Sequence, residues 1–254
     1  MFYFYNSRRL YQKGFKTCCR SVLPYKKTKM HLKVIITGAT GMVGEGVLQE
    51  CMVNPSVEKI LLINRKPSGY SHPKIEEILH GNFNDIGSIA DRVKGYDACY
   101  FCLGVSSVGM KEPDYYAVTY TLTLNFARTL ADLNPQMTFC YVSGAGTDST
   151  EQGRQMWARV KGKTENDLLK LPFKAVYNFR PAVMKPTKGA RNVKGIYRVI
   201  LLLFPLFRAF NHTYFLTLEE VGRAMINVVL QGNPTPVVEV KDIARLSKLH
   251  ISAG

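Results

Sequence analysis

The stretch TGATGMVG, residues 37–44, decides the fold of this chain. It comes directly after the apolar run KVIIT (33–37) and leads into a segment with helical patterning (42–53). A glycine-rich turn between a buried strand and a helix is the context that makes a weak glycine pattern a useful signature of dinucleotide binding. The helix N-terminus supplies N–H donors and the positive end of the helix dipole, and both favour phosphate.

The three glycines of this loop are spaced three residues apart. Gly38 can make the tight turn, Gly41 lets the backbone approach a pyrophosphate, and Gly44 allows the helix to pack on the strand. We therefore predict that the loop contacts the phosphates of a dinucleotide. The residues assigned to this role are Gly38, Thr40, Gly41, Met42, Val43 and Gly44.

Short apolar runs alternate with longer amphipathic stretches along the rest of the chain. The runs are typical of parallel strands buried on both faces. They are KVIIT (33–37), KILLI (59–63), ACYFCL (98–103), MTFCYV (137–142) and KAVYNF (174–179), with helical candidates near 42–53, 85–94, 115–133 and 153–171. This order predicts an α/β fold, a doubly wound parallel sheet (Rossmann fold) with right-handed crossovers and a small C-terminal substrate-side region.

Residues 1–30 differ in composition from the remainder. They hold eight of the 34 Lys and Arg residues and no acid, which leaves +7 of the formal charge of +15 for the rest of the chain. That moderate excess does not require a polyanion, so no nucleic acid partner is expected. The predicted division is a basic extension (1–30) outside the fold and an NAD(P)-binding Rossmann domain (31–254).

Three interpretations of residues 1–30 compete. We favour a translated stretch upstream of a start at Met30, which predicts a cytoplasmic protein. An organellar transit peptide is the alternative, and an arm that binds a membrane surface or nucleic acid is the third.

The six cysteines show no spacing typical of a disulfide framework or a zinc site, so no metal is expected. Cys99 and Cys140 lie inside apolar runs, where cysteine behaves as a small hydrophobe. Cys99 and Cys102 form a C-x-x-C motif within one predicted strand and not at the start of a helix, which disfavours a redox role. A reducing compartment follows.

The end of the second predicted strand, LLINRKP (61–67), indicates the cofactor. An NAD-preferring domain places an acidic residue here for the ribose diol, whereas this chain has Arg65 and Lys66. A guanidinium can bind a 2′-phosphate in a bidentate fork, and an acid would repel it. The sequence therefore predicts NADP (NADPH) in preference to NAD.

Two further segments are placed at the same site by their position. GNFND (81–85) follows a third apolar stretch and is predicted to bring Asp85 near the adenine amino group. CLGVSS (102–107) ends the fourth predicted strand at the carboxyl edge, where open α/β sheets bind ligands. Leu103 and Gly104 are therefore expected to border the cofactor ribose.

Several segments in a fixed order carry a resemblance to a known family. The region 33–231 resembles the atypical short-chain dehydrogenases/reductases, which are similar to NAD-dependent epimerases/dehydratases, near the branch of the Tat-interacting-protein oxidoreductase-like proteins. The matching segments are GATGMVG, INRKP, FCLGVSSVG, YVSGAGTD, VKGKTENDLLKL and NFRPAVM.

The resemblance implies a catalytic set of a serine, a tyrosine and a lysine four residues after the tyrosine. Ser143 matches the serine, which binds a substrate oxygen, and Lys161 matches the lysine, which binds the nicotinamide ribose and lowers the pKa of the tyrosine. The tyrosine position holds Trp157. An indole N–H can donate a hydrogen bond but has no proton to exchange near neutral pH.

Three functions stay open at this point. The first is an NADP-dependent oxidoreductase of unknown substrate that uses another acid, such as Tyr115, Tyr116, Tyr120 or water relayed through Ser143. The second is a catalytically silent NADP(H)-sensing interaction protein. The third is a sugar-nucleotide epimerase/dehydratase, which the missing tyrosine disfavours.

The resemblance also implies that the segment after the sixth strand lies against the nicotinamide carboxamide, through Pro181, Ala182 and Val183. Beyond it, the apolar stretch 195–210 falls short of the ~20 residues that span a bilayer, so membrane contact is not predicted. The expected partner is a small-molecule substrate, and the chain is expected to be a monomer or a homodimer.

Overall fold

The computed structural model describes residues 31–186 and 215–249. Two segments discussed above, the basic extension 1–30 and the apolar stretch 195–210, lie outside the described residues. Within the described part of the chain, no helix is long and apolar enough to cross a membrane.

Seven parallel strands form the central sheet, in the order β3-β2-β1-β4-β5-β6-β9. They are β1 (Leu32–Thr37), β2 (Val57–Asn64), β3 (Ile75–Leu79), β4 (Ala98–Phe101), β5 (Thr138–Val142), β6 (Ala175–Arg180) and β9 (Val237–Glu239). The strand order reverses between β1 and β4, which is the point at which open α/β sheets bind ligands. The predicted doubly wound sheet is confirmed.

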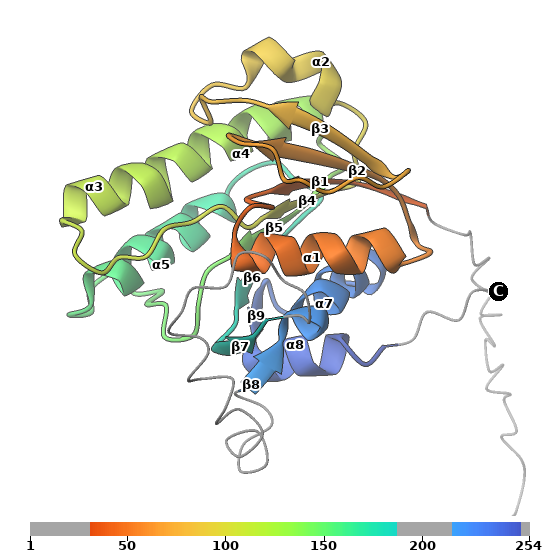
Figure 1. Cartoon of the computed structure of the whole chain (residues 1–254). Coiled ribbons are helices and arrows are strands. Elements are labelled where there is room, and N and C mark those ends of the chain that lie inside the picture. Colours follow the sequence, from red (N-terminus) through yellow and green to blue (C-terminus); the bar gives the residue numbers. More distant parts are fainter. Residues whose placement is uncertain (1–30, 187–214, 250–254) are drawn as a thin grey trace, which may run out of the picture.

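Helices cover both faces of this sheet (Figure 1). One face carries α1 (Met42–Val53), α7 (Leu218–Gln231) and α8 (Val240–Leu246), and the other carries α2 (Ala90–Val93), α4 (Leu122–Leu133) and α5 (Met156–Leu168). A 3-10 turn, η1 (Gly87–Ile89), precedes α2, and α3 (Glu112–Tyr116) continues through a π-helical turn, η2 (Ala117–Thr121), into α4. Two short strands, β7 (Val183–Lys185) and β8 (Phe215–Thr217), pair separately.

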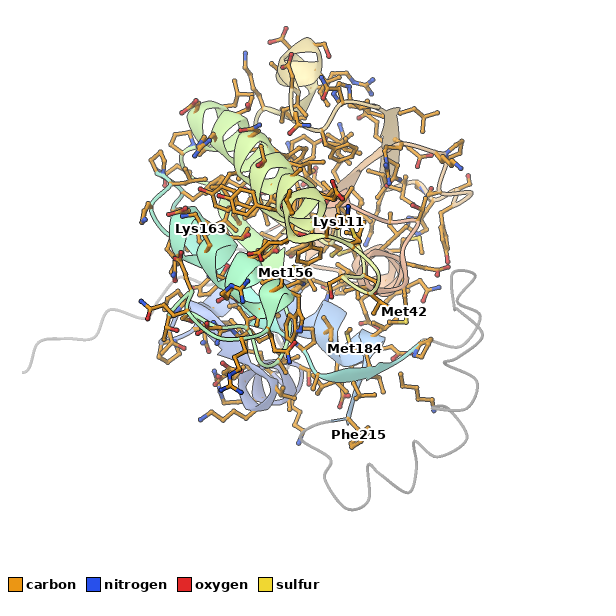
Figure 2. The ribbon with its side chains drawn as sticks, turned by 90° about the vertical axis from the view of Figure 1, so that its left-hand side faces the viewer. Met42, Lys111, Met156, Lys163, Met184 and Phe215 are labelled. Atoms are coloured by element: carbon orange, nitrogen blue, oxygen red, sulfur yellow. The ribbon has the colours of Figure 1, made fainter. Side chains whose placement is uncertain are left out.

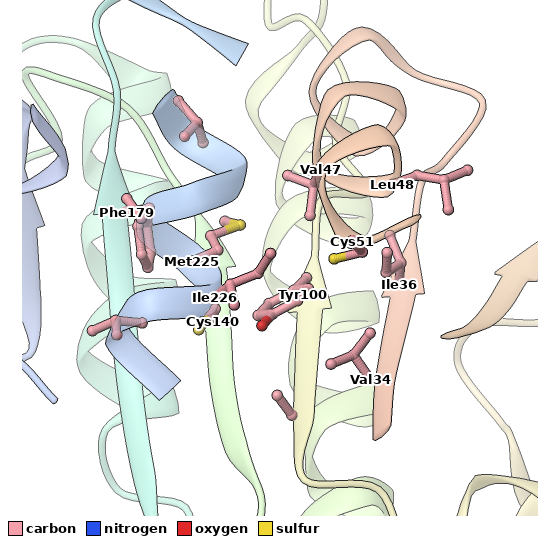
Figure 3. Packing of buried hydrophobic residues seen from close by; sticks show 14 of the residues in the cluster. Val34, Ile36, Val47, Leu48, Cys51, Tyr100, Cys140, Phe179, Met225 and Ile226 are labelled. Atoms are coloured by element: carbon pink, nitrogen blue, oxygen red, sulfur yellow. The ribbon is translucent and has the colours of Figure 1, made fainter. Parts of the chain in front are cut away.

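Successive residues of each central strand point into different cores, which explains why the strands read as continuous apolar runs. In β1, Val34 and Ile36 pack toward α1 and α7, whereas Ile35 belongs to the core beneath α4 and α5. Figure 3 shows the first of these cores, with Met225 and Ile226 of α7 lying against the strands.

Helices α1 and α7 approach each other closely because each presents a glycine to the other. A Cβ added at Gly46 would lie 2.5 Å from Cβ of Leu218, and one added at Gly222 would lie 2.7 Å from Cγ of Glu50. A capping box at Thr217 and Glu220 begins α7 and satisfies its first amides. Helix α7 is therefore fixed against α1, the helix that follows the glycine loop.

The structure corrects several predicted boundaries. Strand β4 ends at Phe101, so Cys102 lies in the loop that follows and not in the strand with Cys99. The helix predicted over 153–171 is confined to α5, because Asp148 accepts hydrogen bonds from the amides of Thr150 and Gly153 and holds that segment as a loop. Burial raises the pKa of the Cys99 thiol, in keeping with its prediction as a small hydrophobe.

Candidate functional site

The glycine loop packs against the first residues of the loop that follows β4. Gly38 has φ +70°, and a Cβ there would lie 2.8 Å from the backbone of Cys102 and Leu103. The amide of Gly41 donates to the carbonyl of Gly38 at 2.9 Å. A Cβ at Gly44 would lie 2.2 Å from that same carbonyl oxygen, so only glycine lets the helix pack this closely.

A cavity of about 450 Å³ lies at the carboxyl edge of the sheet, between the ends of β1, β2 and β4. Among the described residues that line it, none is acidic. They are Gly38, Thr40, Gly41, Ile63, Asn64, Arg65, Lys66, Cys102, Leu103 and Gly104. Figure 2 looks onto this edge of the molecule, where Met42, Lys111 and Met156 mark the starts of α1, α3 and α5.

Arg65 and Lys66 lie exposed at the wall of the cavity formed by the end of β2. Within the described ranges, neither forms an ion pair with a carboxylate. Two cations thus line the cavity without forming an ion pair of their own, which favours an anionic ligand.

The segment that carries these cations is held by two carboxylates. Glu77 of β3 accepts hydrogen bonds from the side-chain amide of Asn64, at 2.8 Å, and from the backbone amide of Ser68, at 2.9 Å. Glu45, buried in the first turn of α1, accepts from the hydroxyl of Tyr70 at 2.7 Å. The sequence analysis missed both acids because their partners lie 9 to 25 residues away and no local spacing marks them.

Ser143 and Lys161 meet at the end of β5. Lys161 Nζ donates to the backbone carbonyl of Ser143 at 2.6 Å, and Ser143 Oγ lies 2.7 Å from Oγ1 of Thr147. Desolvation by burial lowers the pKa of Lys161 to about 8, against the opposing effect of the Glu165 carboxylate. The structure therefore brings together Ser143 and Lys161, which the family pattern pairs. With its pKa lowered to about 8, the Lys161 amine is suited to proton exchange near neutral pH.

Trp157 lies one helical turn before Lys161, half-buried at the start of α5. Its ring covers Gly146, since a Cβ added there would lie 3.5 Å from Cη2 of the indole. Gly146 has φ +86°, so both the left-handed backbone and the indole favour glycine at this point of the loop.

The tyrosines considered as replacement acids are placed unfavourably for proton transfer. Tyr115 is buried, and burial raises its pKa. The Tyr120 hydroxyl donates a hydrogen bond to Asp167 at 2.7 Å, and burial together with that bond raises the pKa of Tyr120 as well. Tyr116 lies against Tyr120 with ring centroids 4.6 Å apart and the rings tilted by 34°.

A buried ion pair fixes α5 to β6. Arg180 contacts Glu165 through Nε, at 3.0 Å, and through Nη2, at 2.5 Å. The guanidinium also reaches Ser149 and Glu239. Arg180, the last residue of β6, thus anchors the helix that carries Lys161.

The remaining assigned residues lie outside the cavity lining. Asp85 is exposed and its Oδ1 accepts from the amide of Gly87 at 2.8 Å, so its contact with adenine stays a prediction. Pro181 is joined to the serine loop, because its carbonyl accepts from the amide of Ala145 at 2.9 Å. Ala182 and Val183 follow it into β7, and their contact with the nicotinamide also stays a prediction.

The residues that line the cavity fit the phosphate and adenosine end of a dinucleotide. Two of the three loop residues in its lining, Gly38 and Gly41, have no side chain, and α1 begins directly after Gly41. Its opposite wall is basic. Neutral groups at Leu103 and Gly104 complete it, as the sequence predicted for a position beside the ribose.

Comparison with known proteins agrees with this geometry. The profile of the "NAD dependent epimerase/dehydratase family" matches residues 34–159, which span the glycine loop to the start of α5. The chain is 22% identical over 211 residues to "Protein FMP52, mitochondrial" of Meyerozyma guilliermondii, covering 79% of this chain and 86% of that protein. It is 25% identical over 153 residues to "Protein HTATIP2" of Rattus norvegicus, covering 59% and 62%.

The fold also matches the Bordetella bronchiseptica enzyme WbmF in complex with NAD+, with a TM-score of 0.59 at 14% identity over 86% of this chain and 77% of that one. Together these similarities support an atypical short-chain dehydrogenase/reductase-like, NAD(P)-binding protein. WbmF has also been solved with NAD+ and UDP. This short-chain dehydrogenase/reductase-like protein thus shares its architecture with a nucleotide-binding enzyme.

The comparisons correct the predicted location. The FMP52 protein of Meyerozyma guilliermondii and two FMP52 proteins of Scheffersomyces stipitis are all named mitochondrial. The cytoplasmic prediction for this short-chain dehydrogenase/reductase-like protein is therefore wrong. It had rested on interpreting the basic, acid-free residues 1–30 as a stretch upstream of the protein's start, a composition that a transit peptide shares.

Proposed function

We propose that the protein is an oxidoreductase that binds NADP(H) and transfers a hydride to the carbonyl carbon of a small-molecule substrate, or from the carbon of the corresponding alcohol. One observation supports this above all others: Arg65 and Lys66 form a basic wall opposite the glycine loop, in a cavity whose described lining holds no acid. A ribose diol needs an acceptor at this position, and a 2′-phosphate needs donors. Arg65 and Lys66 supply such donors, and NADP(H) is the dinucleotide that carries the 2′-phosphate.

Ser143 and Lys161 supply the chemistry at the other end of the site. When bound, NADPH supplies a hydride. Ser143 Oγ donates a hydrogen bond to the substrate oxygen, and Lys161 Nζ gives that oxygen the proton that Trp157 cannot provide. An amine with a pKa of about 8 is matched to proton donation near neutral pH.

Replacement of Arg65 by aspartate tests the cofactor site. We expect the Kd for NADPH to rise by about 100-fold, because one bidentate donor is lost and a charge that repels the 2′-phosphate is gained. The Kd for NADH should change by less than about 3-fold. Trp157 is the single tryptophan of the chain, so quenching of its fluorescence during titration with each nucleotide measures both constants.

The matched control is Arg128→Asp, which makes the same charge change at an exposed position on α4, away from the cavity lining. It should leave both constants close to wild type. Equal weakening by the two substitutions, or an unchanged NADPH constant in Arg65→Asp, would contradict the proposed site. Tight NADPH binding without reduction of any compound in a broad carbonyl panel would instead assign the protein a cofactor-sensing role.

We propose a mitochondrial location, supported by the names of the FMP52 relatives and by the basic, acid-free composition of residues 1–30. A fluorescent protein fused after residue 254 should co-localise with a mitochondrial stain. Replacing the eight basic residues of 1–30 with glutamine should release the fusion into the cytosol. Unchanged localisation of that variant would show that these eight basic residues are not needed for mitochondrial targeting.

A further inference from the structure

A single carboxylate oxygen holds both ends of the segment that carries Arg65 and Lys66. Glu77 Oε1 accepts from Nδ2 of Asn64, at 2.8 Å, and from the backbone amide of Ser68, at 2.9 Å. The two cations lie between these points. Their backbone is therefore closed into a short loop across the Glu77 side chain.

The loop has few other attachments that could set its shape. Asn64 is the last residue of β2 and is buried, with its backbone carbonyl accepting from the amide of His80 at 2.8 Å. Arg65 and Lys66 are themselves exposed, as is Pro67 after them. Because exposed side chains supply little packing, the hydrogen bonds at the two ends determine where the loop directs its charges.

The charge of Glu77 is unfavourable for the ligand proposed here. A carboxylate beside a site for a doubly charged phosphate opposes binding by Coulomb repulsion. Its two hydrogen bonds act in the opposite sense, since they hold two cations toward the cavity before the ligand arrives and so reduce the entropic cost of binding. The charge and the hydrogen bonds therefore predict opposite effects on affinity, and they can be separated.

We infer that Glu77 is a positioning residue that determines cofactor specificity by holding segment 64–68 so that Arg65 and Lys66 face the ribose 2′-phosphate. This inference rests on the proposed NADP(H) site. Glu77 does not line the cavity, so it acts through the two cations and not by contact with the nucleotide.

Two substitutions at Glu77 separate its hydrogen bonds from its charge. Glu77→Gln retains an oxygen that can accept from Asn64 and Ser68 and removes the charge. Glu77→Leu has a similar size and removes both. Calorimetric titration of each full-length variant with NADPH, NADH and 2′,5′-ADP gives the Kd for ligands with and without the 2′-phosphate.

For Glu77→Leu we expect the Kd for NADPH and for 2′,5′-ADP to rise by about 10-fold, with the Kd for NADH within 2-fold of wild type. For Glu77→Gln we expect NADPH to bind as tightly as in wild type, or more tightly. Ser68→Pro, which removes the backbone donor to Glu77 together with the hydroxyl that accepts from the amide of Tyr70, should weaken NADPH binding by about 3-fold and provides an independent readout if Glu77→Leu does not fold.

Four results would overturn the inference. Tighter NADPH binding by Glu77→Leu would show that Glu77 affects affinity only through the repulsion of its negative charge, and not through its hydrogen bonds. Equal losses for NADPH and NADH would indicate a structural role without specificity. An unchanged NADPH preference in both Glu77→Leu and Ser68→Pro would refute the inference while the proposed function stands, whereas a wild-type protein without NADPH preference would refute the proposed cofactor and this inference together.

Discussion

Replacing Lys161 by methionine is expected to lower NADPH-dependent carbonyl reduction by at least about 100-fold, the usual contribution of a positioned general acid. The indole N–H of the tryptophan one turn earlier is not acidic near neutral pH, and the Tyr120 hydroxyl donates a hydrogen bond to Asp167. Lys161 Nζ, fixed at 2.6 Å from the Ser143 carbonyl, is the donor that these placements leave. Single-turnover rates with a fixed substrate measure the loss directly.

The wild-type rate should also depend on pH in a defined direction. Burial favours the neutral amine and lowers the pKa of Lys161 to about 8, so the protonated donor is abundant below that value and scarce above it. We expect kcat/KM to fall by about tenfold per pH unit once pH rises past about 8. Reductive methylation of the cofactor-free protein, followed by mass spectrometry, should show Lys161 becoming reactive over the same range.

Lys161→Arg is the matched control for charge. It retains a cation able to donate to the Ser143 carbonyl, but a guanidinium does not give up a proton in this pH range. NADPH affinity should therefore stay within about 5-fold of wild type while turnover is lost. A rate independent of pH between 6.5 and 9.5, or full turnover in Lys161→Arg, would assign the proton to another group.

The second large effect is on stability. Glu165→Ala should lower the free energy of unfolding by about 3–5 kcal/mol, because it leaves the Arg180 guanidinium buried without its main partner. Glu239, the other acid within reach of Arg180, is 44% exposed and cannot replace a buried carboxylate. Urea denaturation followed by circular dichroism measures the change.

Two companion variants make this prediction specific. Glu76→Ala removes a carboxylate that pairs with Lys59 and Arg92 at the surface, and it should cost less than about 1 kcal/mol. The double variant Glu165→Met with Arg180→Met should recover much of the lost stability, since no unpaired charge remains. A loss in Glu165→Ala no larger than that in Glu76→Ala would show that the pair is not stabilising.

Local features of the sequence were sufficient to predict most strands of the central sheet and the position of the glycine loop. Apolar runs marked the central strands because both faces of the sheet are covered, and the glycine loop could be placed because strand, turn and helix are adjacent in the chain. Arg65, Lys66, Leu103 and Gly104 all line the cavity, as their positions at strand ends predicted.

Contacts between distant residues were beyond such reasoning. The bonds of Glu77 to Asn64 and of Arg180 to Glu165 depend on which strand and helix become neighbours, and neither acid follows a local pattern. β9 was missed for the same reason, because three residues carry no periodicity. Asp85 was assigned to adenine from its position alone, and the structure shows its side chain on the amide of Gly87.

The glycine contact between α1 and α7 limits when α1 can reach its final packing during synthesis of the chain. Helix α1 leaves the ribosome about 165 residues before α7, a delay of about 8–30 s at typical rates of synthesis. Throughout that interval, the apolar face that α7 will cover is open to chaperones and to other nascent chains. The glycine loop therefore gains its final support only after α7 has been synthesised.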